Sequence, residues 1–102
     1  SWLKQKLKEQ KNSSRLIGDV RGEGFFLGIE LVLDPETRDP APHHAKYLVE
    51  RLKSRNILLS IEGPGQNVLK FKPPMVFSHT DAERLLRCLG DVLGESPLKY
   101  NS

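Results

Sequence analysis

The apolar run at residues 25–33 is the strongest strand signal in this chain and constrains its fold most. It consists mainly of aromatic, leucine and β-branched residues with a single charge, which is typical of a strand with a buried face. Shorter extended runs lie at 15–21, 57–60 and 67–71, and apolar residues recur at helical spacing at 2–10, 41–52 and 82–93. This order predicts an α+β fold, in which helices pack on one face of a small, mostly antiparallel sheet.

Capping residues predict where two of the helices begin. Asp39 is expected to cap the middle helix, with Pro40 at its first position, where the missing N–H would be unpaired in any case. Thr80 and Glu83 fit a capping box at the start of the last helix. A chain of 102 residues makes one domain at most. We expect this domain at 1–94 and a flexible tail at 95–102.

The formal charge of +3 raises the question of a nucleic-acid partner. Much of the excess lies in the first helical segment, where four lysines between Lys4 and Lys11 are accompanied by Trp2 as the sole aromatic residue. A nucleic-acid surface usually interleaves aromatic residues or arginines, so a solvated helix face explains these lysines better. No stretch approaches the roughly 18 apolar residues that cross a bilayer. Neither nucleic acid nor a membrane is therefore expected as a partner.

Three glycines, Gly22, Gly24 and Gly28, form a string that resembles a dinucleotide-binding fingerprint. A phosphate-binding glycine loop lies between a strand and the start of a helix, whereas a strand follows these glycines. We therefore expect them to form a structural corner, where they permit a tight bend and a close approach of the backbone.

No constellation of side chains points to catalysis or metal binding by this chain alone. His43 and His44 are neighbours at the start of a helix and point about 100° apart, so they cannot share a metal ion without distortion. Both are expected at the surface, as is His79. The single cysteine, Cys88, cannot form an internal disulfide and is expected beside the core.

The segment at 67–74 carries two lysines followed by Pro73 and Pro74. Alternation along a strand places Lys70 and Lys72 on one face. Two neighbouring ammonium groups can bind an anion, but lysines and prolines also blunt an edge strand. The residue pattern alone favours the edge strand and leaves the anion site open.

Taken together, three strings resemble the C-terminal small domain of class III aminotransferases. They are GDVRGEG at 18–24, GIEL at 28–31 and LKFKPP at 69–74, and their order and spacing match the family over about 16–93. Within the family, the segment at 60–78 is most similar to the phospho-lyase branch, whose members act on 5-phosphohydroxy-L-lysine or ethanolamine phosphate.

The resemblance implies an enzyme that depends on pyridoxal phosphate (PLP), with the cofactor bound mainly by a large domain of the same chain. A lysine of that large domain forms a Schiff base with PLP, which acts as an electron sink. The implied reaction expels phosphate and ammonia from a phosphorylated amine and leaves an aldehyde. A homodimer or homotetramer and a mitochondrial location, otherwise a cytoplasmic one, are implied as well.

For this chain itself, the resemblance implies no catalytic and no cofactor-binding residue, so the isolated chain is expected to be inactive. Many aminotransferases of the family have, at the position of Lys70, an arginine that pairs with the substrate carboxylate. Lysine is a point charge rather than a bidentate fork, so a different anionic substrate is expected. Lys70, Lys72 and Arg21 are the candidates for the substrate side, although Arg21 can instead brace the corner. A small basic α+β binding or interface module without catalysis is the alternative.

Overall fold

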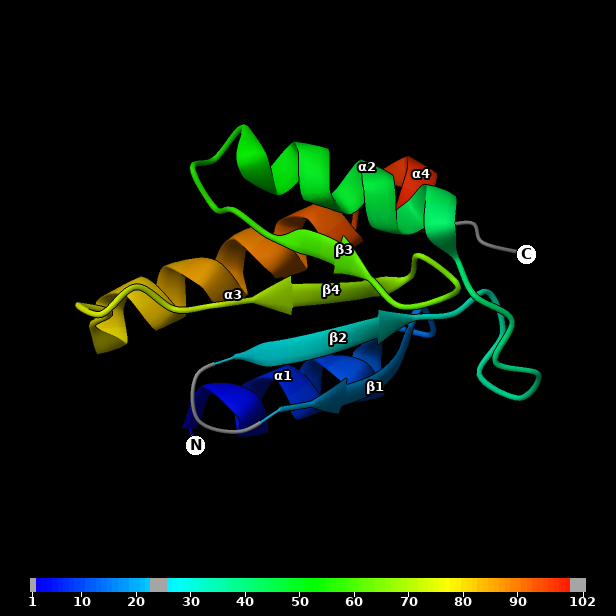
Figure 1. The fold of residues 1–102 in the computed structure, drawn as a ribbon, viewed down its shortest axis with the longest axis horizontal. Coiled ribbons are helices and arrows are strands. Elements are labelled where there is room, and N and C mark those ends of the chain that lie inside the picture. The colour runs from blue at the N-terminus through cyan, green and yellow to red at the C-terminus, as the bar shows by residue number, and fades with distance from the viewer. Residues whose placement is uncertain (1, 23–25, 100–102) are drawn as a thin grey trace.

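A four-stranded antiparallel sheet with strand order β1-β2-β4-β3 forms the centre of the domain. The computed structural model describes residues 2–22 and 26–99 (Figure 1). Its elements are α1 (Trp2–Ser13), β1 (Ile17–Arg21), β2 (Leu27–Leu31), α2 (Pro42–Lys53), β3 (Ser60–Glu62), β4 (Val68–Phe71), α3 (His79–Leu93) and α4 (Ser96–Lys99). Every strand pair within the sheet is antiparallel, so the predicted α+β class is confirmed.

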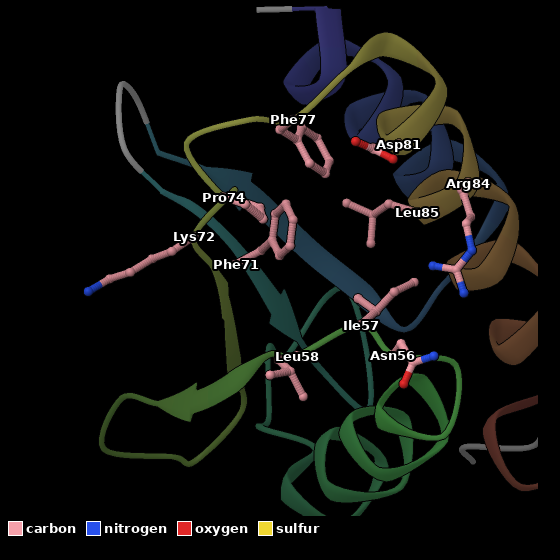
Figure 2. Close-up of a pocket in the computed structure, with 10 residues that line it drawn as sticks. All are labelled: Asn56, Ile57, Leu58, Phe71, Lys72, Pro74, Phe77, Asp81, Arg84 and Leu85. Atoms are coloured by element: carbon pink, nitrogen blue, oxygen red, sulfur yellow. The ribbon is translucent and has the colours of Figure 1, made fainter.

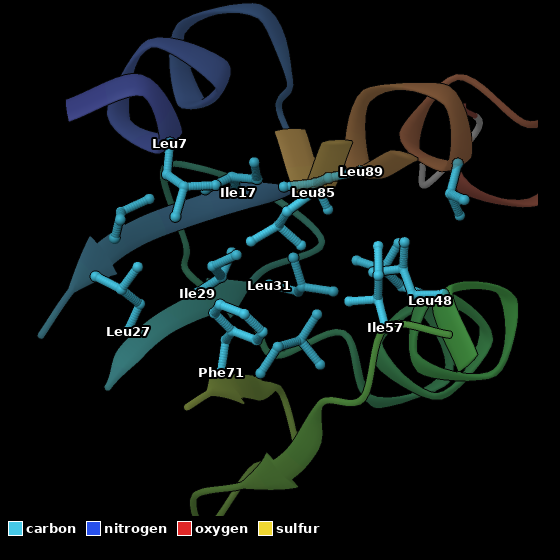
Figure 3. Packing of buried hydrophobic residues seen from close by; sticks show 14 of the residues in the cluster. Leu7, Ile17, Leu27, Ile29, Leu31, Leu48, Ile57, Phe71, Leu85 and Leu89 are labelled. Carbon is cyan, nitrogen blue, oxygen red and sulfur yellow. The ribbon is translucent and has the colours of Figure 1, made fainter. Parts of the chain in front are cut away.

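The helices cover one face of this sheet, because apolar side chains alternate along the strands. Ile29, Leu31 and Leu69 are buried in the same core cluster as Leu48 of α2 and Leu89 of α3. Figure 3 labels all of these residues except Leu69. Burying a leucine or isoleucine side chain contributes about 1.5–3 kcal/mol. The residues that alternate with these core residues along the strands lie on the helix-free face of the sheet. None of the described helices is long and apolar enough to cross a membrane.

The middle helix begins later than its sequence suggests. Its N-cap is Ala41, which has no side-chain capping bond, and Pro42 takes the first position. Pro40 instead forms a bridge with Val32, and the Asp39 carbonyl accepts a hydrogen bond from the Leu33 N–H at 2.7 Å. The prediction of Asp39 as the cap and Pro40 as the first residue is therefore wrong, because this extension of β2 keeps the chain extended through residue 40.

Three other boundaries also differ from the prediction. The capping box of α3 is formed by Ser78 and Asp81, two residues before the expected pair. The strand expected at 57–60 lies at Ser60–Glu62, because Ile57 enters the core. The segment expected as a tail, 95–102, includes the short helix α4, in which Leu98 is 4% exposed, and its residues 100–102 lie outside the described residues.

Of the three glycines expected at the corner, Gly22 has a backbone conformation that favours glycine. Gly22 has a φ of +119°, and a Cβ there would lie 2.4 Å from the carbonyl oxygen of Phe26. Gly28 lies inside β2, where a Cβ would make ordinary contacts of 3.5 Å and more, so no close approach requires a glycine there. Gly24, like the start of the predicted strand at Phe25, lies outside the described residues.

Candidate functional site

The helix-free face of the sheet presents the polar residues of four strands in two rows. The register pairs Lys70 of β4 with Gly28 on one side and with Ser60 on the other. The first row therefore runs Arg21, Gly28, Lys70, Ser60, and the second runs Asp19, Glu30, Val68, Glu62. Because residues opposite each other in a sheet share a face, these rows bring residues of β1 and β2 to the same surface as residues of β4 and β3. We call this surface the open face.

Lys70 lies near the middle of the open face and is held from both sides. Its Nζ is 3.6 Å from Oε1 of Glu62 and 4.4 Å from the centroid of the Phe26 ring. The ring face carries negative charge density and attracts the ammonium. Oε2 of Glu62 accepts a hydrogen bond from the Ser60 hydroxyl at 3.2 Å. With 24% of its side chain exposed, Lys70 is partly shielded but reachable by an anion.

Arg21, the third substrate-side candidate, is engaged with carboxylates. Its Nη2 donates to Oε2 of Glu30 at 3.2 Å, and its Nε lies 3.6 Å from Oδ2 of Asp19. Arg38 donates to the other oxygen of Glu30. The guanidinium therefore links β1 to β2 beside the corner, a geometry that fits the bracing role.

Lys72 follows the end of β4 and does not join Lys70 in a contact that the structure describes. Figure 2 shows it at the rim of a cavity of about 390 Å³, pointing away from the interior. The cavity lies between β4 and α3 and is lined mainly by apolar side chains: Ile57, Leu58, Phe71, Pro74, Phe77 and Leu85. Pro73 lines a second cavity, of about 510 Å³, together with Trp2 and Gly22. The two prolines thus separate two hollows at the end of β4.

Two polar residues of the first cavity, Asp81 and Arg84, make structural hydrogen bonds. Asp81 accepts from the Ser78 N–H at 3.0 Å, and Arg84 donates to the Arg55 carbonyl. A PLP site needs a lysine facing inward and an acidic partner for the pyridinium nitrogen. Because Lys72 points outward and Asp81 caps a helix, this cavity does not fit the cofactor. Among residues 2–22 and 26–99, no cluster of metal ligands is present either.

The histidines are placed largely as expected. His43 and His79 are exposed, whereas His44 is partly buried, and its Nδ1 is buried without a hydrogen-bond partner. Desolvation, and to a smaller extent the neighbouring His43, lowers the pKa of His44. Cys88 is 6% exposed on the inner face of α3, in agreement with the prediction.

The residues that surround Lys70 were not predicted from the sequence. Ser60 and Glu62 face it across the hairpin that connects β3 and β4. A signal was present: a hairpin whose loop is the Gly-Pro-Gly-Gln-Asn segment at 63–67 pairs 62 with 68 and 60 with 70. Because the strand was expected at 57–60 and β3 lies at Ser60–Glu62, the pairing of Glu62 with Val68 was not predicted.

Comparison with known proteins decides the family. A family model described as aminotransferase class-III matches residues 1–93. The chain belongs to the class III aminotransferase family. Members of this family depend on PLP. The match also takes in the first helix, which the three sequence strings had not covered.

Several relatives show which activities occur among similar proteins. The chain is 40% identical over 99 residues to an alanine–glyoxylate aminotransferase 2-like protein of Drosophila melanogaster, covering 92% of this chain. It is 39% identical over 92 residues to an ethanolamine-phosphate phospho-lyase homologue of Caenorhabditis elegans, covering 89% of this chain. A mitochondrial alanine–glyoxylate aminotransferase 2 homologue of Arabidopsis thaliana is 36% identical, over 87% of this chain.

One solved structure supports the same placement. It is a phospholyase from Arthrobacter in complex with phosphoethanolamine, with a TM-score of 0.87 and 38% identity over 94% of this chain. This chain covers 23% of that structure and about a fifth of the length of the three relatives. The relatives therefore possess some 80% of sequence to which this chain has no counterpart.

Proposed function

We propose that this chain forms a substrate-side wall in a PLP-dependent phospho-lyase of the family. The net reaction is the conversion of a phosphorylated amine and water into an aldehyde, ammonia and inorganic phosphate. The favoured substrate is 5-phosphohydroxy-L-lysine, with ethanolamine phosphate next. Two of the similar proteins carry names that fit this chemistry, one of them in complex with phosphoethanolamine.

The observation that carries the proposal is the position of Lys70. Its ammonium lies on the open face, partly exposed, and is held between the Phe26 ring and Glu62. A compact ammonium attracts phosphate as a point charge, whereas the arginine common in the family at this position suits a planar carboxylate. Lys72 is a second, outlying candidate for the same anion, and Arg21 acts as the brace of the corner.

The cofactor belongs to the part of the enzyme that this chain does not include. The first cavity does not fit PLP, because Lys72 points outward and Asp81 caps a helix, so the chain's own contribution is to orient the substrate and exclude water. We expect the isolated chain to show no absorbance band of protein-bound PLP when the cofactor is added. A clear band would contradict the assignment of the cofactor to the rest of the protein.

An ordinary transaminase is the second candidate, and the names of two relatives favour it. The two activities are separated by assaying the full-length enzyme, loaded with PLP, for phosphate release from each phosphorylated amine and for amino transfer from alanine to glyoxylate. Phosphate release without net amino transfer supports the lyase. Amino transfer without phosphate release overturns it.

The role of Lys70 is tested by Lys70→Ala in the same full-length enzyme. Loss of one charged contact to the substrate should lower kcat/KM about tenfold to hundredfold, equivalent to about 1–3 kcal/mol. Lys53→Ala, an exposed lysine at the end of α2, is the matched control and should leave kcat/KM unchanged. An unchanged kcat/KM in Lys70→Ala removes this residue from the substrate site.

The assembly and location of the enzyme complete the proposal. The proposed partners are the large domain of the same polypeptide and further copies of the chain. The copies form a homodimer or a homotetramer. A mitochondrial location is proposed because the Arabidopsis thaliana relative bears that location in its name. Sedimentation of the full-length protein and fractionation of cells that express it test both statements.

A further inference from the structure

Phe26 contacts Lys70 without offering a charge that an incoming anion has to displace. The centroid of its ring lies 4.4 Å from Lys70 Nζ, and 39% of Phe26 is exposed. The ring face attracts the ammonium through its negative charge density, but the ring has no net charge. Glu62, on the side of β3, is a full negative charge with which every anion that binds Lys70 competes. The ring contact can therefore persist when an anion binds, whereas the ion pair is weakened.

The register of the sheet explains how the ring reaches the ammonium. Gly28 of β2 lies directly opposite Lys70 and contributes no side chain to the open face. Phe26 precedes Gly28 by two residues, so it lies on the same face, diagonal to Lys70. Residues at diagonal positions are about 7–8 Å apart, which is within reach of an aromatic ring and a long side chain.

The corner at Gly22 determines where Phe26 lies. Gly22 has a φ of +119°, and a Cβ there would lie 2.4 Å from the carbonyl oxygen of Phe26. The backbone at Gly22 thus runs against the backbone at Phe26, an approach that a glycine permits. The ring is therefore placed by the backbone and is available before any ligand binds.

A support of this kind matters because the four-carbon stem of a lysine is flexible. An ammonium that occupies its binding position for only a fraction of the time binds an anion with an affinity reduced by that fraction. We propose that Phe26 is a positioning residue, which holds the Lys70 ammonium on the open face for the anionic group of the substrate. This inference rests on the proposed function, since it uses the substrate role of Lys70. The support is the same for a phosphate and for a carboxylate.

The test changes the charge density of the ring while it preserves the ring's shape. The full-length, PLP-loaded enzyme is prepared with phenylalanine or with mono-, di- or trifluorinated phenylalanine at position 26. Each fluorine withdraws electron density and weakens the attraction of the ring face for a cation. The value of kcat/KM for the amine that the enzyme converts should fall stepwise, about twofold to fivefold over the series, mainly through a rise in KM. An equal kcat/KM across the series overturns the inference.

Natural substitutions and a matched ring complete the comparison. Phe26→Leu removes the ring and should lower kcat/KM by a similar factor, whereas Phe26→Tyr keeps the ring face and should retain most of the wild-type value. The same fluorinated series at Phe77, whose ring packs on that of Phe71 with 5.5 Å between centroids, should leave kcat/KM unchanged. An equal fall in both series would mean that fluorination acts through the fold, which contradicts the positioning role.

A second background shows whether Phe26 acts through Lys70. The Lys70→Ala enzyme has no ammonium for the ring to hold, so the fluorinated series at position 26 should no longer alter kcat/KM. A dependence on fluorine that persists in this background would mean that the ring meets the substrate itself, and it contradicts the inference.

The outcomes also separate this inference from the proposed function. If the enzyme transfers the amino group and releases no phosphate, the lyase proposal fails, and the fluorinated series is still decisive with the amine that is converted. If Lys70→Ala leaves kcat/KM unchanged, the substrate role of Lys70 fails and the role of Phe26 fails with it. If Lys70→Ala lowers kcat/KM and the series at Phe26 is flat, the role of Phe26 alone fails and the proposed function stands.

Discussion

At the scale of single residues, Gly22 shows why the corner needs glycine. Its φ of +119° lies in a region that residues with a Cβ rarely adopt, and a Cβ would lie 2.4 Å from the Phe26 carbonyl oxygen. Gly22→Ala should therefore lower the free energy of unfolding by about 1–3 kcal/mol, as measured by urea denaturation.

Gly28→Ala is the matched control for this substitution. A Cβ at position 28 would meet Arg21 Cγ at 3.5 Å and Val68 Cγ1 at 3.6 Å, which are ordinary van der Waals contacts. It should change the unfolding free energy by less than Gly22→Ala does. Equal losses at both positions would mean that the backbone conformation at Gly22 is not what requires the glycine.

A second feature at this scale is Glu95, which joins the segment after α3 to α2. Glu95 accepts hydrogen bonds from Arg51 at 2.9 and 2.8 Å and from the Tyr47 hydroxyl. These two donors, Arg51 first, lower the pKa of Glu95 to about 2. Because the folded pKa lies below the usual 4.5, the carboxylate stabilises the fold fully above about pH 4.5, and this stabilisation is lost as the pH falls towards 2.

The prediction concerns the thermal midpoint of the chain as a function of pH. Glu95→Gln should lower the midpoint near neutral pH and reduce its fall between about pH 4.5 and 2, because the ionised partner of Arg51 is missing. Glu36→Gln, in an exposed loop away from Arg51, controls for the loss of one negative charge. If the thermal midpoint of Glu95→Gln varied with pH in parallel with that of the wild type, the Glu95 carboxylate would not stabilise the fold.

At the scale of elements, α3 could begin with either of two capping pairs, Ser78 with Asp81 or Thr80 with Glu83, and the structure has the first. Ser78 Oγ accepts from the Asp81 N–H at 3.1 Å, and the Asp81 carboxylate accepts from the Ser78 N–H at 3.0 Å. Ser78→Ala should lower the unfolding free energy by about 1 kcal/mol, since it leaves helix N–H groups without this partner. Thr80→Ala, inside the exposed first turn, should cost clearly less. The reverse order would mean that α3 begins at Thr80 in solution.

The helices also show which features could be predicted from the sequence. The helical spacing of apolar residues at 82–93 agrees with the buried face of α3, which includes Ala82, Leu85 and Leu89, because that pattern is local. Its cap was misplaced by two residues because Ser78 with Asp81 and Thr80 with Glu83 both satisfy the local capping pattern.

The start of α2 and the surroundings of Lys70 required tertiary information. The bridge between Val32 and Pro40 keeps the chain extended before α2, and no local signal around Asp39 reports it. Lys70 could be selected from the sequence, whereas Glu62 and Ser60 depend on the register of the β3–β4 hairpin. A register error of one residue would have turned these side chains to the other face.

At the scale of the whole molecule, a compact domain carries a concentrated apolar surface. The radius of gyration of 12.6 Å agrees with the value of about 13 Å for 100 folded residues. Yet Leu58, Met75 and Val76 are 70%, 102% and 86% exposed. Leu58 lines the cavity of about 390 Å³, and the other two lie in the segment between Pro74 and Phe77, which line it as well. Exposed apolar surface gathered in this way is typical of a site of association.

This surface leads to a prediction for the isolated chain. Replacing both Met75 and Val76 by serine should reduce self-association, measured by sedimentation, and the binding of an apolar dye. The unfolding free energy should change by less than about 0.5 kcal/mol, because neither side chain is buried. Glu36→Ser, equally a change in an exposed loop, should affect neither quantity. A large loss of stability in the double variant would show that the two residues pack on the domain in solution, and unchanged association would show that the contacts between copies lie elsewhere.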